Sequence, residues 1–256
     1  MDYFFVISIS LFASFLTLFS GFGLGTLLLP AMIIVLPTQG AVTATAIVHL
    51  SNNILKVMLF GKSCKKDVLI RFGVIAIFAS FIGAQLLVKL ASLPPIFTYT
   101  LFDQVKKIFP LTFIISILIF IFAVFDLSSI KERLKFGKSM LPIGGFISGF
   151  LGGLSGHQGA MRSAFLANSG LTKDSFIGTG VTIACLVDIT RITVYGLHLS
   201  SIGKDNISLM IASCISAFFG VFIGKRLLKT VTMEQIQKIV GVGLILLSIA
   251  LGIGII

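Results

Sequence analysis

Arg162 lies directly behind a cluster of glycines and polar residues in otherwise apolar sequence. The cluster runs Gly152-Gly153-Leu154-Ser155-Gly156-His157-Gln158-Gly159, and no acidic residue is close to Arg162 along the chain. A guanidinium group binds oxyanions, as do hydroxyl and amide groups and the free N–H groups at the start of a helix. We therefore expect Arg162 to contact an anionic substrate, assisted by Ser155, Gly156, His157, Gln158 and Gly159.

A second polar group lies in the middle of the apolar segment 41–60 and consists of His49, Ser51, Asn52 and Asn53. Adjacent positions on a helix point in different directions, so these side chains cannot all face one cavity. Helix–helix hydrogen bonding is the competing role for each of them. We expect His49, Asn52 and Asn53 to line the substrate pathway, and the sequence leaves open which of them face it.

Three charged residues, Lys56, Asp188 and Arg191, also lie within apolar segments. A charge inside a bilayer costs at least ~2.5 kcal/mol, so each of these residues is expected to have a partner or a function. Asp188 lies one helical turn before Arg191, which predicts that the two pair. Lys56 and Arg191 lie near the ends of their segments, where a long side chain can also extend to the membrane interface. These three residues are secondary candidates for the site.

The sequence offers no signature of a metal site, a phosphate-binding loop or a redox pair. The three cysteines, Cys64, Cys185 and Cys214, have no CxxC spacing, and there is no HExxH motif. We therefore expect no cofactor, no metal and no catalytic residue.

The composition requires that these residues work inside a membrane. Of the 256 residues, 56% are hydrophobic and 11% are charged, whereas a soluble domain carries about 25% charged residues. Apolar runs of about 20 residues, each able to cross about 30 Å of hydrocarbon, recur along the chain. The net charge of +11 is typical of basic cytoplasmic loops and does not indicate nucleic-acid binding. The expected partners are the lipid bilayer and a small anion, and a homo-oligomer is left open.

The chain divides into two similar halves. Ser20-Gly21 recurs as Ser155-Gly156 at an offset of 135, and the same offset relates Asn53 to Asp188 and Lys56 to Arg191. Further along, the stretch that begins at Gly83 resembles the one that begins at Gly224. The common order of these matches predicts an internal duplication.

Each half opens with a glycine-rich element: Gly21, Gly23 and Gly25 in the first, and the cluster 152–159 in the second. Glycine costs a helix about 1 kcal/mol relative to alanine, so these clusters predict helix breaks. Close helix packing is the competing role for membrane glycines. A broken helix either continues across the membrane or turns back as a re-entrant hairpin.

The placement of basic residues favours the re-entrant alternative. If both opening elements cross straight through, the basic residues outside the spans divide 9 to 8 between the two sides. If both turn back, 13 gather on one side and four, Lys89, Lys106, Lys107 and Lys204, remain on the other. Only the second distribution follows the positive-inside rule.

The predicted fold is an all-α polytopic membrane protein with two inverted repeats, each a glycine-broken re-entrant hairpin followed by three transmembrane helices. The first repeat covers 1–125, with the re-entrant element at 1–36 and spans at 41–60, 68–90 and 108–125. A cytoplasmic linker covers 126–139. The second repeat covers 140–256, with the re-entrant element at 140–170 and spans at 174–197, 206–228 and 239–256. Both termini are expected outside a bacterial inner membrane.

Paired glycine-broken segments at matching positions of two halves point to the midplane site of a secondary transporter that works by alternating access. Here the residues resemble the sulfite exporter TauE/SafE family. The resemblance rests on Gly21-Phe22-Gly23-Leu24-Gly25 through Leu29-Pro30, on Ala41-Val42-Thr43-Ala44-Thr45, and on the cluster 152–159 followed by Gly178-Thr179-Gly180. It covers essentially the whole chain.

The resemblance implies export of sulfite or of an organosulfur anion such as sulfoacetate across the inner membrane. His157-Gln158 stand where family members commonly have small residues or glycine, which points to an altered substrate. The sequence leaves open which anion is carried, in which direction, and whether a proton accompanies it.

Two other classes of function compete with transport. Gly153-Leu154-Ser155-Gly156 is a GxSG motif and His49 with Asn53 forms HxxxN, as in rhomboid intramembrane serine proteases. His198 is the downstream candidate for the base, and a protease would leave the duplication unexplained. A membrane assembly factor without transport would fit the apolar spans but would not explain Arg162 or the two breaks.

Overall fold

The computed structural model describes residues 2–16, 24–101, 103–128, 136–167, 169–196, 206–227 and 234–255, and these residues are almost entirely helical. Four helical stretches are long and apolar enough to cross a membrane: Thr38–Ser63, Lys66–Ala91, Lys173–Tyr195 and Ile207–Gly224. Four shorter apolar helices accompany them. The protein is therefore an α-helical, multi-pass membrane protein, as the composition predicts.

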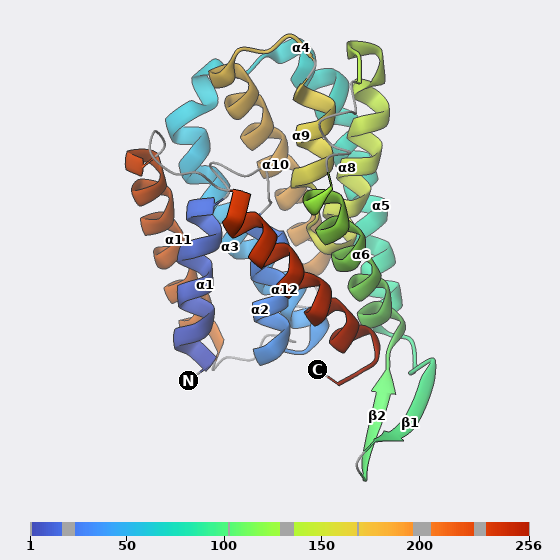
Figure 1. Cartoon of the computed structure of the whole chain (residues 1–256). Coiled ribbons are helices and arrows are strands. Elements are labelled where there is room, and N and C mark those ends of the chain that lie inside the picture. The colour runs from blue at the N-terminus through green and yellow to red at the C-terminus, as the bar shows by residue number, and fades with distance from the viewer. Residues whose placement is uncertain are drawn as a thin grey trace.

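The first half contains a pair of antiparallel helices, a long helix, a second long helix and a shorter one (Figure 1). The elements are α1 (Asp2–Leu16), α2 (Leu24–Val35), α3 (Thr38–Phe60), α4 (Lys66–Val68), α5 (Val74–Ala91) and α6 (Pro110–Leu127). A π-helical turn at Leu69–Gly73 joins α4 to α5 in one continuous stretch. Pro110 begins α6, where its missing N–H needs no partner.

The second half repeats this order of elements. Its helices are α8 (Leu141–Ser155), α9 (Gly159–Ala167), α10 (Lys173–Tyr195), α11 (Ile207–Leu227) and α12 (Glu234–Gly252). The side chain of Thr172 caps the N-terminus of α10 by accepting the N–H of Ser175.

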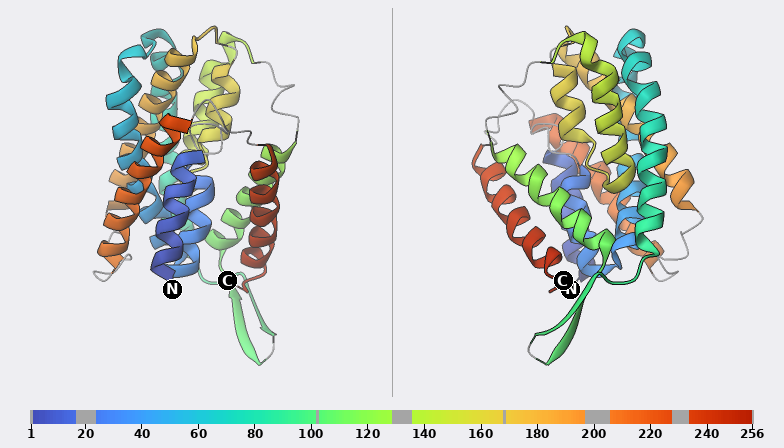
Figure 2. Two further views of the ribbon diagram at one scale, coloured as in Figure 1. Left: turned by 60° about the vertical axis from the view of Figure 1, so that its left-hand side comes forward. Right: turned by 90° about the vertical axis from the view of Figure 1, so that its right-hand side faces the viewer.

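Two helix pairs enter the molecule from opposite ends (Figures 1 and 2). The pair α1 and α2 begins and ends at the end where the N- and C-termini lie, whereas α8 and α9 begin and end at the other end, near α4. The two pairs meet near the middle of the molecule. A Cβ atom on Gly25, in the first turn of α2, would lie only 3.0 Å from the carbonyl oxygen of Gly156 behind α8.

Helices of one half pack against helices of the other in a reciprocal pattern. The first helix of each half packs along the fourth major helix of the other, α1 on α11 and α8 on α5. The two 23-residue helices α3 and α10 pack on each other, as do α6 and α12. These exchanges bury both hairpins between the halves.

Glycines allow these helices to approach closely. A Cβ atom on Gly149 would lie 2.3 Å from the backbone oxygen of Ala76 in α5, and one on Gly153 would lie 2.0 Å from that of Ser80. In the other pair, a Cβ atom on Gly220 of α11 would lie 2.3 Å from the backbone oxygen of Leu11 in α1. Close packing is therefore the role of part of the second glycine cluster, as small residues provide in membranes.

One element departs from the predicted all-α fold. Residues Phe97–Leu101 (β1) and Gln104–Ile108 (β2) form an antiparallel hairpin that projects at the end where the termini lie (Figure 1). Because Ile108 pairs with Phe97 in this hairpin, the helix expected from residue 108 begins at Pro110. Threonine, tyrosine and valine favour strands, and this segment is too short and polar to be read as a span.

Candidate anion-binding site

The turn between α8 and α9 leaves helical N–H groups without an acceptor in their own helix, in the middle of the molecule. Gly156 ends α8 in the left-handed conformation, with φ +84°, which glycine adopts without steric cost. The first helical hydrogen bond of α9 runs from the N–H of Arg162 to the oxygen of Gln158, at 3.0 Å. The N–H groups of Gly159 to Met161 therefore have no acceptor within α9, and they give its start a partial positive charge.

Gly156 also touches a buried guanidinium. A Cβ atom on Gly156 would lie 2.6 Å from Nη1 of Arg191, a residue of α10 that is 0% exposed. With Gly25 of α2 on its other side, Gly156 connects the two hairpins to Arg191. Neither Arg191 nor Lys56, which is 5% exposed, extends to the surface of the molecule.

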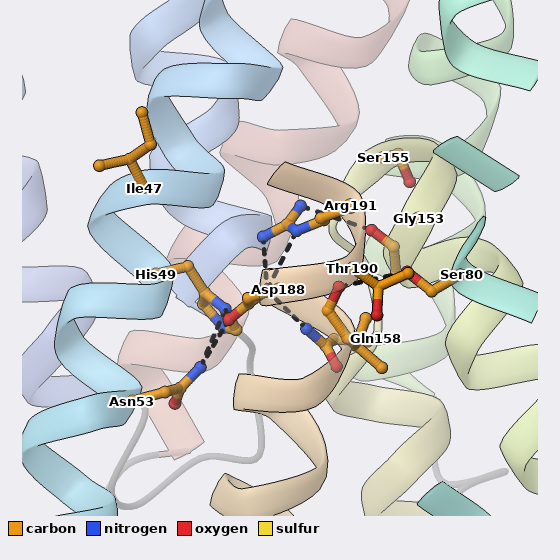
Figure 3. Close-up of polar contacts among 12 residues, drawn as sticks. Ile47, His49, Asn53, Ser80, Gly153, Ser155, Gln158, Asp188, Thr190 and Arg191 are labelled. Carbon is orange, nitrogen blue, oxygen red and sulfur yellow. Dashed lines mark hydrogen bonds and ion pairs between the residues drawn. The ribbon is translucent and has the colours of Figure 1, made fainter. Parts of the chain in front are cut away.

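Asp188 is the centre of a buried polar network (Figure 3). Its side chain is 0% exposed, and it pairs with Arg191 one turn further along α10, as the spacing predicts. Arg191 Nε donates to Oδ1 at 3.0 Å, and Nη2 lies 2.9 Å from the same oxygen. On the other side, His49 Nδ1 lies 2.6 Å from Oδ2, and Asn53 Nδ2 donates to Oδ2 at 3.0 Å.

Gln158 links this network to Arg162. Its Nε2 donates to Oδ1 of Asp188 at 3.0 Å, and its Oε1 accepts from Nη1 of Arg162, also at 3.0 Å. Because Asp188 binds the amide nitrogen, the amide oxygen must face Arg162. Within the described part of the chain, Arg162 forms no ion pair with a carboxylate, in keeping with its isolation in the sequence.

His157 lies at the tip of the second hairpin and is 1% exposed. Its ring stacks on Phe122 of α6, with centroids 5.2 Å apart, and its Nδ1 lies 3.0 Å from Oγ of Ser155. Its Nε2 has no hydrogen-bond partner among the described residues. A buried polar atom without a partner is costly, and a ligand could satisfy it.

The polar residues of α3 separate by direction, as adjacent helical positions must. His49 and Asn53 face α10, whereas Asn52 accepts at Oδ1 from Oγ of Ser14 in α1, at 3.0 Å. Ser51 donates to its own helix at Ile47 and accepts from Cys214 of α11. The Nδ2 of Asn52, which is fully buried, has no partner among the described residues.

Of the residues predicted from the sequence, the structure places Gly25, Ser155, Gly156, His157, Gln158, Gly159 and Arg162 around the meeting point of the two hairpins. Gly21 and Gly23 lie outside the described residues. Four contributors were not predicted: Tyr195, which donates to the backbone oxygen of Gly153, and Ser14, Ser148 and Phe122. Only the repeat offset of 135, which equates Asn53 with Asp188, could have indicated that these two positions face each other.

Among the residues that the structure describes, the geometry does not assemble a protease. His49 and Asn53 are engaged with Asp188, and Ser155 Oγ donates to the backbone oxygen of Leu151 in its own helix, at 3.2 Å. His198 lies outside the described residues. Within the described residues, no group of three or more histidine, cysteine, aspartate or glutamate side chains could hold a metal ion.

Comparisons with known proteins agree with the family indicated by the glycine motifs. Neither the curated proteins nor the solved structures gave a match. A family model described as Sulfite exporter TauE/SafE matches residues 6–251, which is nearly the entire chain. The protein therefore belongs to the sulfite exporter TauE/SafE family, whose members are membrane transporters and not enzymes.

Proposed function

We propose that the protein exports a small sulfur-containing oxyanion, either sulfite or an organosulfonate such as sulfoacetate, across the bacterial inner membrane. The observation that carries this proposal is the excess of buried positive charge. Arg191 is buried and Arg162 is half-buried, and Asp188 is the one carboxylate beside these two arginines in the described part of the chain. Uncompensated charge at this depth is costly, so an excess of cations favours an anionic ligand.

Arg162 is the proposed principal contact, because no carboxylate among the described residues lies within ion-pair distance of it. The N–H groups at the start of α9 and the unpartnered Nε2 of His157 support an anion at the same tip. The proposed binding residues are Gly21, Gly23, Gly25, Ser155, Gly156, His157, Gln158, Gly159 and Arg162, with His49, Asn52 and Asn53 along the pathway. Secondary candidates for this site are Lys56, Asp188 and Arg191.

We further propose that the halves are inverted repeats that rock against each other to alternate access. The reciprocal packing of α1 on α11 and of α8 on α5 supports this relation, as does the opposite direction of the two hairpins (Figure 2). The hydrogen bond between Asn53 and Asp188 also supports an inverted repeat, because equivalent positions of two such repeats meet each other on the two-fold axis between them. The repeats would cover 1–125 and 140–256, with the linker 126–139 cytoplasmic and both termini outside.

The membrane potential alone could drive this export. Moving one negative charge out of a negative interior releases about 2.3 kcal/mol at 100 mV. A uniporter is therefore sufficient, and no second substrate is needed to explain net efflux.

Proteoliposomes that contain the purified protein test the proposal. They are loaded in turn with sulfite, sulfoacetate, taurine or sulfate, and efflux is followed under an imposed interior-negative potential. We expect at least one sulfur oxyanion to leave faster than from protein-free liposomes. Equal efflux with and without protein for all four compounds would exclude the proposed substrate class.

A further inference from the structure

The two oxygens of Asp188 bind different halves of the molecule. Oδ1 accepts from Gln158 and Arg191, which belong to the second half, whereas Oδ2 binds His49 and Asn53 of the first half (Figure 3). Five nitrogen atoms lie between 2.6 and 3.0 Å from this one carboxylate. Four of these contacts are hydrogen bonds, two on each oxygen, so the acceptor capacity of the carboxylate is used.

This set of donors is the set that would bind a free oxyanion. A guanidinium, two amide nitrogens and an imidazole around one anionic group match sulfite or a sulfonate as well as they match a carboxylate. Asp188 and Arg191 are both 0% exposed. An anion that binds Nε of Arg191 and the amide of Gln158 therefore competes with Oδ1 of Asp188 for the same donors.

We propose that Asp188 is an intramolecular competitor of the exported anion. Asp188 holds the donors of the empty site, and the anion must displace it from its contacts at Oδ1. This inference rests on the proposed function and adds Arg191 to the contacts of the substrate. In the loaded state, Arg191 and Gln158 turn from Oδ1 to the substrate oxygens. Asp188 keeps His49 and Asn53 through Oδ2, so its charge stays partnered in both states.

The displacement explains how the empty carrier avoids a buried charge that has no partner. Arg191 always has an anion next to it, either Asp188 or the substrate, and it is never left alone at membrane depth. Gln158 exchanges partners together with Arg191, and since its oxygen binds Arg162, substrate binding is communicated to the start of α9.

The first experiment measures anion binding by the purified full chain through thermal shifts over a range of sulfite and formate concentrations. In D188N and D188A the donors are released, so we expect sulfite to bind about tenfold tighter or better than in the wild type. Formate, which has the size of the missing carboxylate, should stabilise D188A and leave the wild type unchanged. The control D67N removes an exposed carboxylate that pairs with Arg71 and should not differ from the wild type.

The double variant D188N/R191Q identifies the source of the gain. It removes both charges of the pair, so it should remain folded and lose the tighter binding. Sulfite affinity in D188N that equals or falls below that of the wild type would overturn the proposal, and so would a D188A that formate does not stabilise. The formate result is independent of the substrate class, so it separates a failure of this inference from a failure of sulfur-oxyanion export.

A measurement on the wild type covers the case in which the Asp188 variants do not fold. Infrared difference spectra are recorded with and without saturating sulfite. Release of Oδ1 should shift the carboxylate stretching bands, while unchanged bands at saturation would show that Asp188 keeps its partners and would contradict displacement.

Discussion

At the scale of single residues, Arg162 and Arg191 differ although both belong to the network around Gln158 and Asp188. Arg191 has a carboxylate within hydrogen-bond distance, whereas Arg162 donates to the neutral oxygen of Gln158 among the described contacts. A cation without a counter-charge attracts an anion more strongly than one that is already paired. Arg162 is therefore the position where a single substitution should affect substrate binding most directly.

We predict that R162Q weakens binding of the transported sulfur oxyanion by about tenfold or more, because a charge-assisted contact is lost. Equilibrium binding and efflux from proteoliposomes both measure this. R71Q, which removes an exposed arginine of the α4 region, is the matched control and should transport like the wild type. Unchanged binding in R162Q would remove Arg162 from the site.

Tyr195 fixes the second hairpin from α10. Its buried hydroxyl donates to the backbone oxygen of Gly153, so Y195F leaves that oxygen without its donor. We predict a loss of about 1 kcal/mol in the free energy of unfolding, measured as a lower melting temperature in detergent. Y99F breaks a similar bond, to Ile253, at an exposed position and should have a smaller effect. An equal effect of the two would show that burial does not set the cost.

At the scale of elements, the glycine face of α8 determines how deeply the second hairpin lies. Gly145, Gly149 and Gly153 are spaced by four residues, and a Cβ atom on any of them would clash with the backbone of the π-helical turn or α5. The hairpin is therefore held by backbone contact along its entire first helix. Its tip carries the N–H groups of the first turn of α9, so this packing also sets the position of the proposed anion site.

We predict that G149A destabilises the protein by about 1–3 kcal/mol, since overpacking forces the helices apart. The control is G243A on α12, where a Cβ atom would meet nothing within 4 Å. Alanine favours the helix there, so G243A should leave the melting temperature unchanged or raise it slightly. Similar melting temperatures for the two variants would show that α8 can shift without cost.

The elements that follow from local sequence were easier to predict than the contacts between them. The glycine cluster 152–159 predicted a helix break, and its glycine at 156 indeed adopts a positive φ, because this depends on neighbouring residues alone. The bond between His49 and Asp188 joins residues 139 positions apart and left no periodic signal. Gly83 and Gly220 each contact the first helix of the other half, so the packing makes these two glycines counterparts. The sequence comparison instead matches Gly83 with Gly224.

At the scale of the whole molecule, large apolar side chains cover the outer faces of the helices. Phe78, Phe81 and Ile82 of α5 are exposed, as are Phe219 and Phe222 of α11. Phenylalanine and isoleucine on the outside, with serine, histidine and aspartate inside, is the arrangement that suits a lipid environment. The two helices that carry this surface are also those that hold the hairpins.

We predict that the end with the β hairpin faces outward. In a variant whose three free cysteines are replaced by serine, K107C on β2 should react with a membrane-impermeant maleimide added to intact cells. K66C at the start of α4 lies at the opposite end and should react only after the cells are opened (Figure 1). Labelling of K66C in intact cells would reverse the proposed orientation.

The contact between Asn53 and Asp188 also bears on the ancestry of the chain. Before a duplication is fused, the two halves are separate and identical subunits, and equivalent positions on the two-fold axis carry the same residue. Two aspartates there would repel each other at hydrogen-bond distance, and two asparagines would leave the arginine at position 191 without a counter-charge. The mixed pair requires that the two halves differ in sequence at these positions. On the proposed duplication, the anion-like group at the centre of this transporter therefore arose after its two halves had diverged in sequence.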